Sequence, residues 1–465
     1  MASSASTGPR DLTTGPIGKT LLLFALPTLG ANILQSLNGT INAIWIGNFL
    51  GEAALAATSN ANLVMFLMFA AVFGLAMAAT ILIGQAMGRR DVDLARRTLG
   101  SAIGLIGLLG TGVAVVGWIW SPLVLHLLAT PHDALPLATA YLRVIFLGLP
   151  FTFLMVLLTS ALRGAGDSIT PLWAMILNVV LDAGLNPVFI RGFGPIPAMG
   201  ISGSALATLI AGLVTLIFLV IYIYRKNLVI RLRGAEFAYL RPQRGLIGTI
   251  FAKGIPMGLT MVVMSASMLA MIGLVNRAGV ETTAAYGAIS QLWSYIQMPA
   301  FAVGAAVSAM AAQNIGAGRW DRVGRVTLYG AGINVLMTAT MIVLITLVDR
   351  QVLGLFLTPS SPAVPVAQHI HLVASGSFVL FGVSMVMTSV VRANGAVVAP
   401  LVILFIAAFP ARFGLALLFL PHYGPEAIWW SFWAGSISSI ILTGAYYRWG
   451  GWRKAHLLEE TRASA

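Results

Sequence analysis

A short basic segment occurs twice in this chain: QAMGRRDVDLARRT at residues 85–98 returns as QNIGAGRWDRVGRVT at residues 313–327. In both places the segment separates two long apolar runs. Other residues recur at the same spacing of about 229 positions, namely Pro27 with Pro256, Arg163 with Arg392 and Pro171 with Pro400. Because these pairs follow one another in the same order, the sequence predicts two tandem structural repeats.

The composition is that of a membrane protein. Of the 465 residues, 58% are hydrophobic and only 9% are charged, and the mean hydropathy is +0.91. Soluble globular proteins carry about 25% charged residues. The chain has no cysteine, which excludes disulfides and thiolate metal sites.

Twelve apolar runs are long enough to cross a bilayer as helices, which takes roughly 17–25 residues each. They lie near 20–47, 55–86, 99–120, 137–162, 169–190, 200–224, 247–275, 284–311, 326–348, 368–391, 396–420 and 426–447. Six helices per repeat is an even number, so both repeats begin on the same side of the membrane. The sequence therefore predicts an all-α polytopic membrane protein, with twelve transmembrane helices in two pseudo-symmetric six-helix lobes. Such a parallel repeat is typical of transporters.

The placement of the basic residues predicts the orientation. Most of the 27 Lys and Arg residues fall in the termini and the connections on one side, which the positive-inside rule makes cytoplasmic. This topology accounts for the net charge of +13, so we expect membrane lipid as a partner and no nucleic acid. The expected parts are a cytoplasmic N-terminal tail (1–19), an N-lobe (20–224), a basic cytoplasmic linker loop (225–246), a C-lobe (247–447) and a cytoplasmic C-terminal tail (448–465).

One acidic residue, Asp182, lies deep in an apolar run. It is about 17 Å along its helix at 1.5 Å per residue, close to the midplane of a ~30 Å hydrocarbon core. A charged carboxylate there costs at least about 2.5–3.5 kcal/mol. Amide side chains that share a helical face are candidates to offset this cost: Asn178 and Asn186 on the same helix, and Gln35, Asn38 and Asn42 on the first helix.

Asp182 has two interpretations. In the structural one, it is a hydrogen-bonded buried group that fixes helix packing. In the functional one, the low dielectric constant disfavours the charged form, so the carboxyl carries a proton at neutral pH and releases it when the site opens to water. Carboxylate and amide oxygens would also suit Na⁺. Asp182 and these amides are therefore the candidate cation-coupling site, and Na⁺ is the one metal ion expected there.

In the second repeat, methionines stand on the helix that corresponds to the first helix and its amide side chains. Five methionines follow a single face of its first helix: Met257, Met261, Met264, Met268 and Met271. Because methionine is unbranched and adaptable, it is frequent on surfaces that bind varied partners, and we expect these residues to line a substrate cavity. Helix packing is the alternative. Arg412, midway through the eleventh run, is a further cavity candidate unless it pairs with carbonyl groups or reaches toward a membrane interface.

Five stretches carry a family resemblance. They are ALPTLGANILQSLNGTINAIWIGNFLG in the first helix, GQAMGRRD after the second, ALRGAGDSITP between the fourth and fifth, GFGPIPAMGISGSALAT before the sixth, and KGIPMG at the start of the seventh. Together they resemble the multidrug and toxic compound extrusion (MATE) family of secondary transporters, over residues 20–448. The resemblance implies a V-shaped cavity between two lobes in the plasma membrane, which is the inner membrane in bacteria. It also implies export of organic, often cationic or amphipathic compounds against an inward H⁺ or Na⁺ gradient.

This chain differs from typical family members in the positions of its acidic residues within the membrane. Where members usually carry an aspartate in the first helix, it has Asn42. In the fifth helix, DAGLNP at 182–187 aligns Asp182 with a family asparagine and Asn186 with a family aspartate; a second alignment makes Asp182 the aspartate. Thr208 matches a threonine that joins the polar network in some members. Coupling by a deep carboxylate would thus depend on Asp182 alone.

The sequence predicts a cation-coupled antiporter that acts as a monomer by alternating access, with a small organic substrate and no cofactor beyond the coupling ion. A lipid-linked oligosaccharide flippase of the same superfamily and an uncoupled passive channel are the alternatives. An enzyme is not expected, because the six histidines lie near helix ends or tails without H-E-x-x-H spacing. The phosphate-binding pattern G-x-x-x-x-G-K-[ST] is also missing.

Overall fold

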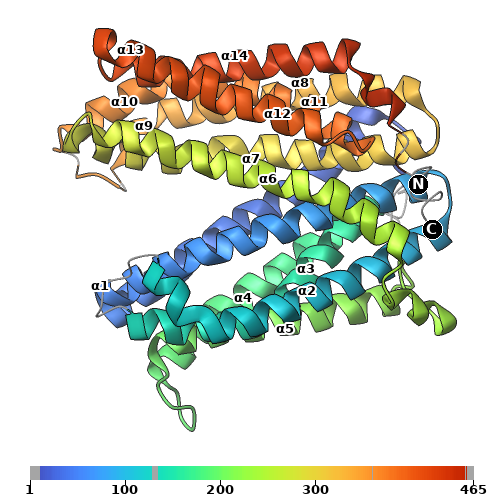
Figure 1. Cartoon of the computed structure of the whole chain (residues 1–465). Coiled ribbons are helices and arrows are strands. Elements are labelled where there is room, and N and C mark those ends of the chain that lie inside the picture. Colours follow the sequence, from blue (N-terminus) through green and yellow to red (C-terminus); the bar gives the residue numbers. More distant parts are fainter. Residues whose placement is uncertain (1–10, 128–134, 355, 359, 456, 458–465) are drawn as a thin grey trace, which may run out of the picture. The chain divides into compact units, whose positions relative to one another are not determined.

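The structure, a computed structural model, describes residues 11–127, 135–354, 356–358, 360–455 and 457, and the regular elements in these ranges are helices (Figure 1). The first half contains α1 (Ile17–Gly88), α2 (Val92–Leu127), α3 (Leu135–Gly164), α4 (Ile169–Arg191), α5 (Gly200–Arg225) and η1 (Gly234–Leu240). The second contains α6 (Arg244–Asn276), α7 (Val280–Gly316), α8 (Trp320–Leu347), α9 (Asp349–Leu353), α10 (Ala363–Ala374), α11 (Ser377–Ala393), α12 (Val398–Ile406), η2 (Ala407–Gly414), α13 (Leu415–Tyr423), α14 (Glu426–Trp449) and η3 (Gly451–Lys454). Residues 1–10 and 458–465 of the expected tails lie outside the described residues.

The predicted membrane-spanning helices are confirmed. Among the described residues, ten helices are long and apolar enough to cross a membrane, two of them within α1. The first of these ends at Gly51, where the helix kinks and φ is 80°, a conformation that glycine adopts without strain. The pair α10 and α11, bent by 46°, passes the same test when the two helices are taken together, and α14, with 24 residues, corresponds to the twelfth predicted run. The fold is therefore an all-α membrane architecture of twelve helices.

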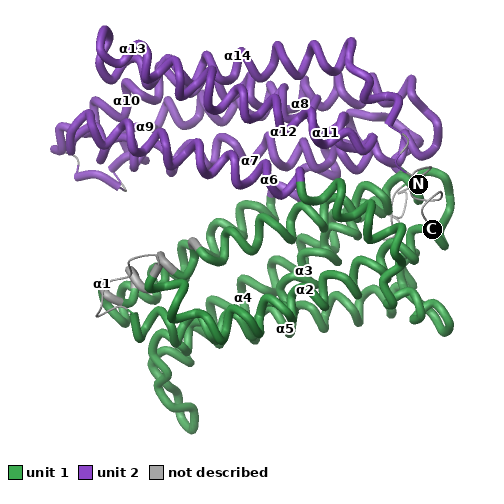
Figure 2. Tube along the Cα trace, viewed as in Figure 1, with its two compact units in different colours: residues 1–11, 30–255, 458–465 green, residues 12–29, 256–457 purple. Residues whose placement is uncertain are grey.

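The chain forms two compact units (Figure 2). Each unit contains the beginning of one helix whose remainder belongs to the other unit. Unit 1 contains residues 30–255, and unit 2 contains residues 12–29 and 256–457. Both α1 and α6 therefore change unit part-way along, close to Pro27 and Pro256, the two prolines that the sequence repeat pairs. The expected lobes, 20–224 and 247–447, divide the chain at loops, whereas the units divide it inside these two helices.

In unit 2, the segment before α1 is bound by the second copy of the repeated basic segment. The backbone N–H of Leu12 donates to Gln313 Oε1 (3.1 Å), and Asn314 Nδ2 donates to the Leu12 carbonyl oxygen (3.1 Å). Arg319 Nη1 donates to the Thr13 carbonyl oxygen (2.7 Å). Apolar side chains of residues 12–25 also belong to a buried core with α7, α8 and α11. Residues 12–29 are thus an integral part of unit 2.

In unit 1, the first copy of the basic segment binds the connection that leads into α6. Arg96 Nη1 forms a salt bridge with Glu236 (2.7 Å), and Arg96 Nε donates to the Val229 carbonyl oxygen (2.9 Å). The Tyr239 hydroxyl donates to Asp93 Oδ1 (2.7 Å). Each copy of the repeated segment therefore binds the part of the chain that directly precedes α1 or α6, the two helices that change unit.

We expect Asn314→Leu to destabilise unit 2. Asn314 is fully buried, donates to the carbonyl oxygens of Leu12 and Met310, and accepts from Arg322 Nε (3.2 Å). Leucine would leave buried polar groups unsatisfied at about 1–3 kcal/mol each, so a loss of roughly 2–5 kcal/mol should lower the Tm of the purified protein. The control is Arg325→Gln, which removes an exposed ion pair and should change stability by less than about 1 kcal/mol. Equal Tm values for both variants would contradict the assigned role.

We expect Gly104→Ala to displace η1 from α2. A Cβ at position 104 would overlap the carbonyl oxygen of Leu240, a backbone atom that cannot rotate away. Trypsin should then cut the connection after Arg233 and Arg244 at least several times faster than in the unaltered protein. At Gly107, one turn along, a Cβ meets nothing within 4 Å, so Gly107→Ala is the matched control. Unchanged cleavage of Gly104→Ala would show that the contact does not hold η1 in place.

Candidate functional site

Asp182 is fully buried in α4 and accepts four side-chain hydrogen bonds. Its Oδ2 accepts from Nδ2 of Asn38 and Nδ2 of Asn42, both at 2.8 Å. Its Oδ1 accepts from the Thr208 hydroxyl and from Nδ2 of Asn186, both at 3.1 Å. The donors come from α1, α4 and α5, all within unit 1.

Helical spacing explains how these elements deliver the donors. Asn38 and Asn42 are one turn apart on α1, so both amides reach the same carboxylate oxygen. Asn186 follows Asp182 by one turn of α4, and its Nδ2 also donates to Asn42 Oδ1 (2.9 Å). Thr208 reaches Asp182 because α5 packs along α4. The network thus links three helices of unit 1 through one carboxylate.

Not every polar residue that shares a predicted face belongs to the network. Gln35 is exposed and Asn178 is partly buried, and no described hydrogen bond joins either of them to Asp182. Tyr141, which the sequence did not single out, is buried in α3 and interacts electrostatically with Asp182. A tyrosine inside an apolar run gives no periodic signal, so it could not have been found from spacing.

The network contains acceptors that lack donors. Among the described residues, the buried amide oxygens Asn38 Oδ1 and Asn186 Oδ1 have no hydrogen-bond partner. A charged carboxylate uses all four donors, whereas a protonated carboxyl needs an acceptor for its own O–H. A rotated amide could offer one of these oxygens to that proton, or both oxygens could help to bind a cation. In the described part of the chain, no three His, Cys, Asp or Glu side chains gather into a metal site.

The methionines of α6 have different surroundings. Met257 and Met271 are buried, and Met271 belongs to a core cluster with Leu274 and Trp293. These two contribute to packing, which was the alternative interpretation of the stripe. Met261 and Met264 are partly buried and Met268 is exposed, and for these three a role in a substrate cavity stays a prediction.

Arg412 lies in the π-helical segment η2 of unit 2. Its guanidinium carbon is 3.6 Å from the centroid of the Phe432 ring, and the side chain also interacts with Tyr286. Arg412 Nε is buried and has no hydrogen-bond partner in the described chain, and no described carboxylate forms a salt bridge with this residue. Arg412 is thus a partly buried cation that stacks on Phe432 and interacts with Tyr286.

A twelve-helix membrane protein built from two parallel repeats, with one deep carboxylate, has the architecture of a secondary transporter. The MatE family model matches residues 27–188 and, a second time, residues 256–418. The chain therefore belongs to the MatE (multidrug and toxic compound extrusion) family, as the resemblance of its sequence implied. The double match also confirms the internal repeat.

Relatives resemble the chain over nearly its whole length. It is 33% identical over 444 residues to "Probable multidrug resistance protein YoeA" of Bacillus subtilis (strain 168), which covers 95% of each chain. It is 31% identical over 451 residues to "Probable multidrug resistance protein YpnP" of the same strain, which covers 97% of this chain and 99% of YpnP. The crystal structure of a MATE in complex with MaD3S superposes with a TM-score of 0.87 at 21% identity, covering 98% of this chain and all of that one, and shows the shared fold.

The two family matches differ in length by one residue, and the π-helical segment η2 lies within the longer match. The second match is the longer one, and a π-helical segment arises when one residue is inserted into an α-helix. From the sequence alone, Asp182 was expected opposite Ala411, and Arg412 opposite Ala183. With the extra residue placed before Arg412 in η2, Arg412 lies opposite Asp182 instead. In that alignment, the two repeats carry opposite charges at corresponding sequence positions.

Proposed function

We propose that this transporter exports organic, amphipathic molecules in exchange for H⁺ or Na⁺, and that Asp182 is the coupling carboxylate. The observation that carries the proposal is the full burial of Asp182 among four hydrogen-bond donors and two unsatisfied amide oxygens. The names of the relatives YoeA and YpnP, both probable multidrug resistance proteins, support the class of substrate.

Free-energy estimates support both a charged and a protonated form of the Asp182 carboxyl group. A charge near the bilayer centre costs about 2.5–3.5 kcal/mol or more. Hydrogen bonds to a charged group return about 1.5–3 kcal/mol each, so the four donors can offset that cost. Together the four bonds return about 6–12 kcal/mol, so the charged form is favoured while all of them are in place, and the loss of two or more of them brings the two terms to a similar size. A proton or a sodium ion bound at Asp182 would therefore be coupled to the packing of α1, α4 and α5.

Alternating access is the proposed mechanism, with α1 and α6 as the moving connections. Each helix belongs partly to one unit and partly to the other, and each contains a proline close to the change. Proline removes one helical hydrogen bond, so bending is least costly there. We infer that Pro27 and Pro256 mark the hinges at which the two units move.

Arg412 supports a second element of the proposal, recognition of a negatively charged group on the substrate. A cation in a membrane helix is costly, and stacking on an aromatic ring returns only about 2 kcal/mol. Its Nε, buried and without a partner among the described residues, can donate to an anionic group.

Proteoliposomes test the proposed antiport. We expect efflux of a lipophilic cationic dye to accelerate at least several-fold when an H⁺ or a Na⁺ gradient is imposed, and the effective ion identifies the coupling ion. Dye movement that ignores both gradients would indicate a passive channel and overturn the proposal. Movement of a fluorescent lipid-linked oligosaccharide without dye efflux would favour a flippase instead.

The remaining expectations complete the proposal. We infer that the protein is a monomer in the plasma membrane, with both termini in the cytoplasm, and that the coupling ion is its only small cofactor. The basic residues of the connection between α5 and α6 support this orientation. Protease protection of a C-terminal tag in sealed inside-out vesicles would contradict it.

A further inference from the structure

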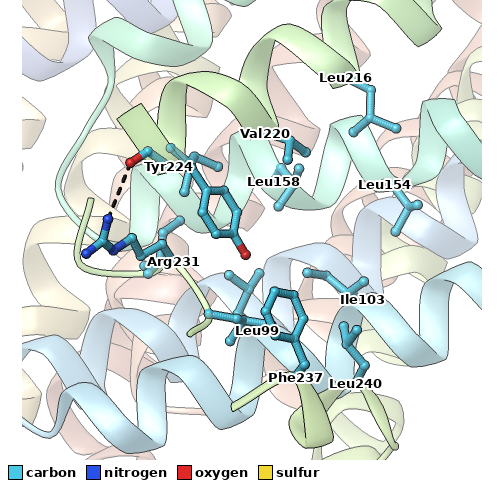
Figure 3. A pocket seen from close by; sticks show the side chains of 13 residues that line it. Leu99, Ile103, Leu154, Leu158, Leu216, Val220, Tyr224, Arg231, Phe237 and Leu240 are labelled. Atoms are coloured by element: carbon cyan, nitrogen blue, oxygen red, sulfur yellow. Dashed lines mark hydrogen bonds between the residues drawn. The ribbon is translucent and has the colours of Figure 1, made fainter. Parts of the chain in front are cut away.

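A narrow apolar cavity of about 200 Å³ lies in unit 1 beneath the connection between α5 and α6 (Figure 3). Leucine, isoleucine and valine side chains of α2, α3 and α5 line its walls. Phe237 and Leu240 of η1 close it on the side of the connection, and Tyr224 stands at the end of α5. Among the described lining residues, Arg231 alone is charged.

The guanidinium group of Arg231 has little hydrogen bonding with the described part of the protein. Its Nη1 donates to the Tyr224 carbonyl oxygen at 3.4 Å, and its Nε is buried with no partner in the part of the chain that is described. Glu236, an acid that interacts electrostatically with Arg231, is already bound by the Arg96 side chain and by the backbone N–H of Arg233 (2.8 Å). The cavity therefore ends at a guanidinium that lacks a strong anionic partner.

The wider charge around Arg231 is also positive. Burial lowers the pKa of Arg231, and the neighbouring cations Arg233 and Arg96 lower it further. The connection and its flanks carry additional basic residues, Arg225, Lys226, Arg241 and Arg244. An anion bound at Arg231 would relieve this repulsion, whereas a cationic compound would be repelled.

We propose that this cavity holds one acyl chain of an anionic phospholipid, with the lipid phosphate bound by Arg231. The cavity is smaller than the roughly 300–1,000 Å³ of a site for a drug-sized ligand, and its apolar lining suits one end of a lipid acyl chain. It lies where α5 ends at Arg225, the depth at which basic residues meet lipid headgroups. The lipid would brace the connection that leads into α6, at a site separate from Asp182.

Native mass spectrometry of the purified full-length protein tests this site. The protein is incubated in detergent with dioleoyl phosphatidylglycerol or, in parallel, with dioleoyl phosphatidylcholine. We expect one phosphatidylglycerol to be retained at about tenfold lower lipid concentration than phosphatidylcholine. Arg231→Gln should abolish this preference, and Arg233→Gln, which removes an exposed neighbouring cation, should preserve it. Equal retention of the two lipids by the unaltered protein would overturn the proposal.

The second part of the experiment fills the cavity with a larger side chain. Leu158→Trp, or Ile103→Phe if the tryptophan variant does not fold, should prevent retention of both lipids. Leu108→Trp places the same side chain at an exposed position on α2 and is the control. The anionic lipid should also raise the Tm of the unaltered protein and not that of Arg231→Gln. If both cavity-filling variants still retain the lipid, or if only the Leu108→Trp control loses it, the lipid binds elsewhere and the assignment is refuted.

Discussion

Replacing Asp182 by asparagine is expected to abolish gradient-driven efflux. The asparagine side chain would keep the size and much of the hydrogen bonding of the carboxyl group, but it can neither release a proton nor supply a negative charge to Na⁺. Dye efflux from proteoliposomes should therefore fall to the passive leak, whichever ion drives the unaltered protein. The Tm should stay the same or rise, because the variant no longer keeps a titratable acid in a fully buried place.

A matched control separates the loss of charge from general damage. Asp321→Asn removes an acid whose side chain is 68% exposed and which pairs with Arg325 on the surface of α8. It should retain full efflux. If Asp182→Asn transports as fast as Asp321→Asn under the same gradient, Asp182 is not the coupling residue. Direct dye-binding measurements add a second readout, since binding should survive in Asp182→Asn while coupled transport does not.

Replacing Arg412 by methionine is expected to change the charge preference of transport without harming the fold. A buried charge can be replaced by an apolar side chain of similar volume with little loss of stability, and sometimes with a gain. Stability should therefore hold, while export of an anionic dye should fall by about tenfold and export of a cationic dye should not. Arg412→Lys should recover only part of the anionic export, because lysine lacks the flat group that stacks on Phe432.

Arg143 supplies the control for this experiment. Like Arg412 it lies over an aromatic ring, Trp118, at 5.0 Å from the centroid, and its Nε is buried without a described partner. It belongs to α3 in unit 1, two residues after Tyr141, and no described hydrogen bond joins it to Asp182. Arg143→Met should leave the charge preference unchanged. A similar change in both variants, or in neither, would remove the argument for a substrate contact at Arg412.

The sequence predicted the number and order of the helices well, because each membrane span must bury about 20 apolar residues and so leaves a long apolar run. It could not predict that α1 and α6 change unit. The spacing of the repeat pairs Pro27 with Pro256, yet it does not say which unit each helix beginning packs against. That choice depends on distant partners such as Gln313 and Asn314, and their hydrogen bonds leave no periodic pattern.

The sequence predicted part of the hydrogen-bond network of Asp182, whereas the function of these residues stays a prediction. A lone deep acid with amides one turn away correctly indicated Asn38, Asn42 and Asn186 as its partners. The same spacing also suggested Gln35, because a helical face is broad and spacing does not fix where a neighbouring helix lies. The π-helical residue in η2 was equally hidden, since an inserted residue changes the register of a repeat without changing its composition.

The position of residues 12–29 has a consequence for how the protein is made. The partners of Leu12 in α7 lie 301 residues later in the chain. At a synthesis rate of about 5–20 residues per second, the ribosome reaches them only tens of seconds after the first helix has emerged. During that interval the beginning of α1 must wait in the membrane without its native neighbours. The N-terminal helix is therefore the first to be synthesised and among the last to find its final packing.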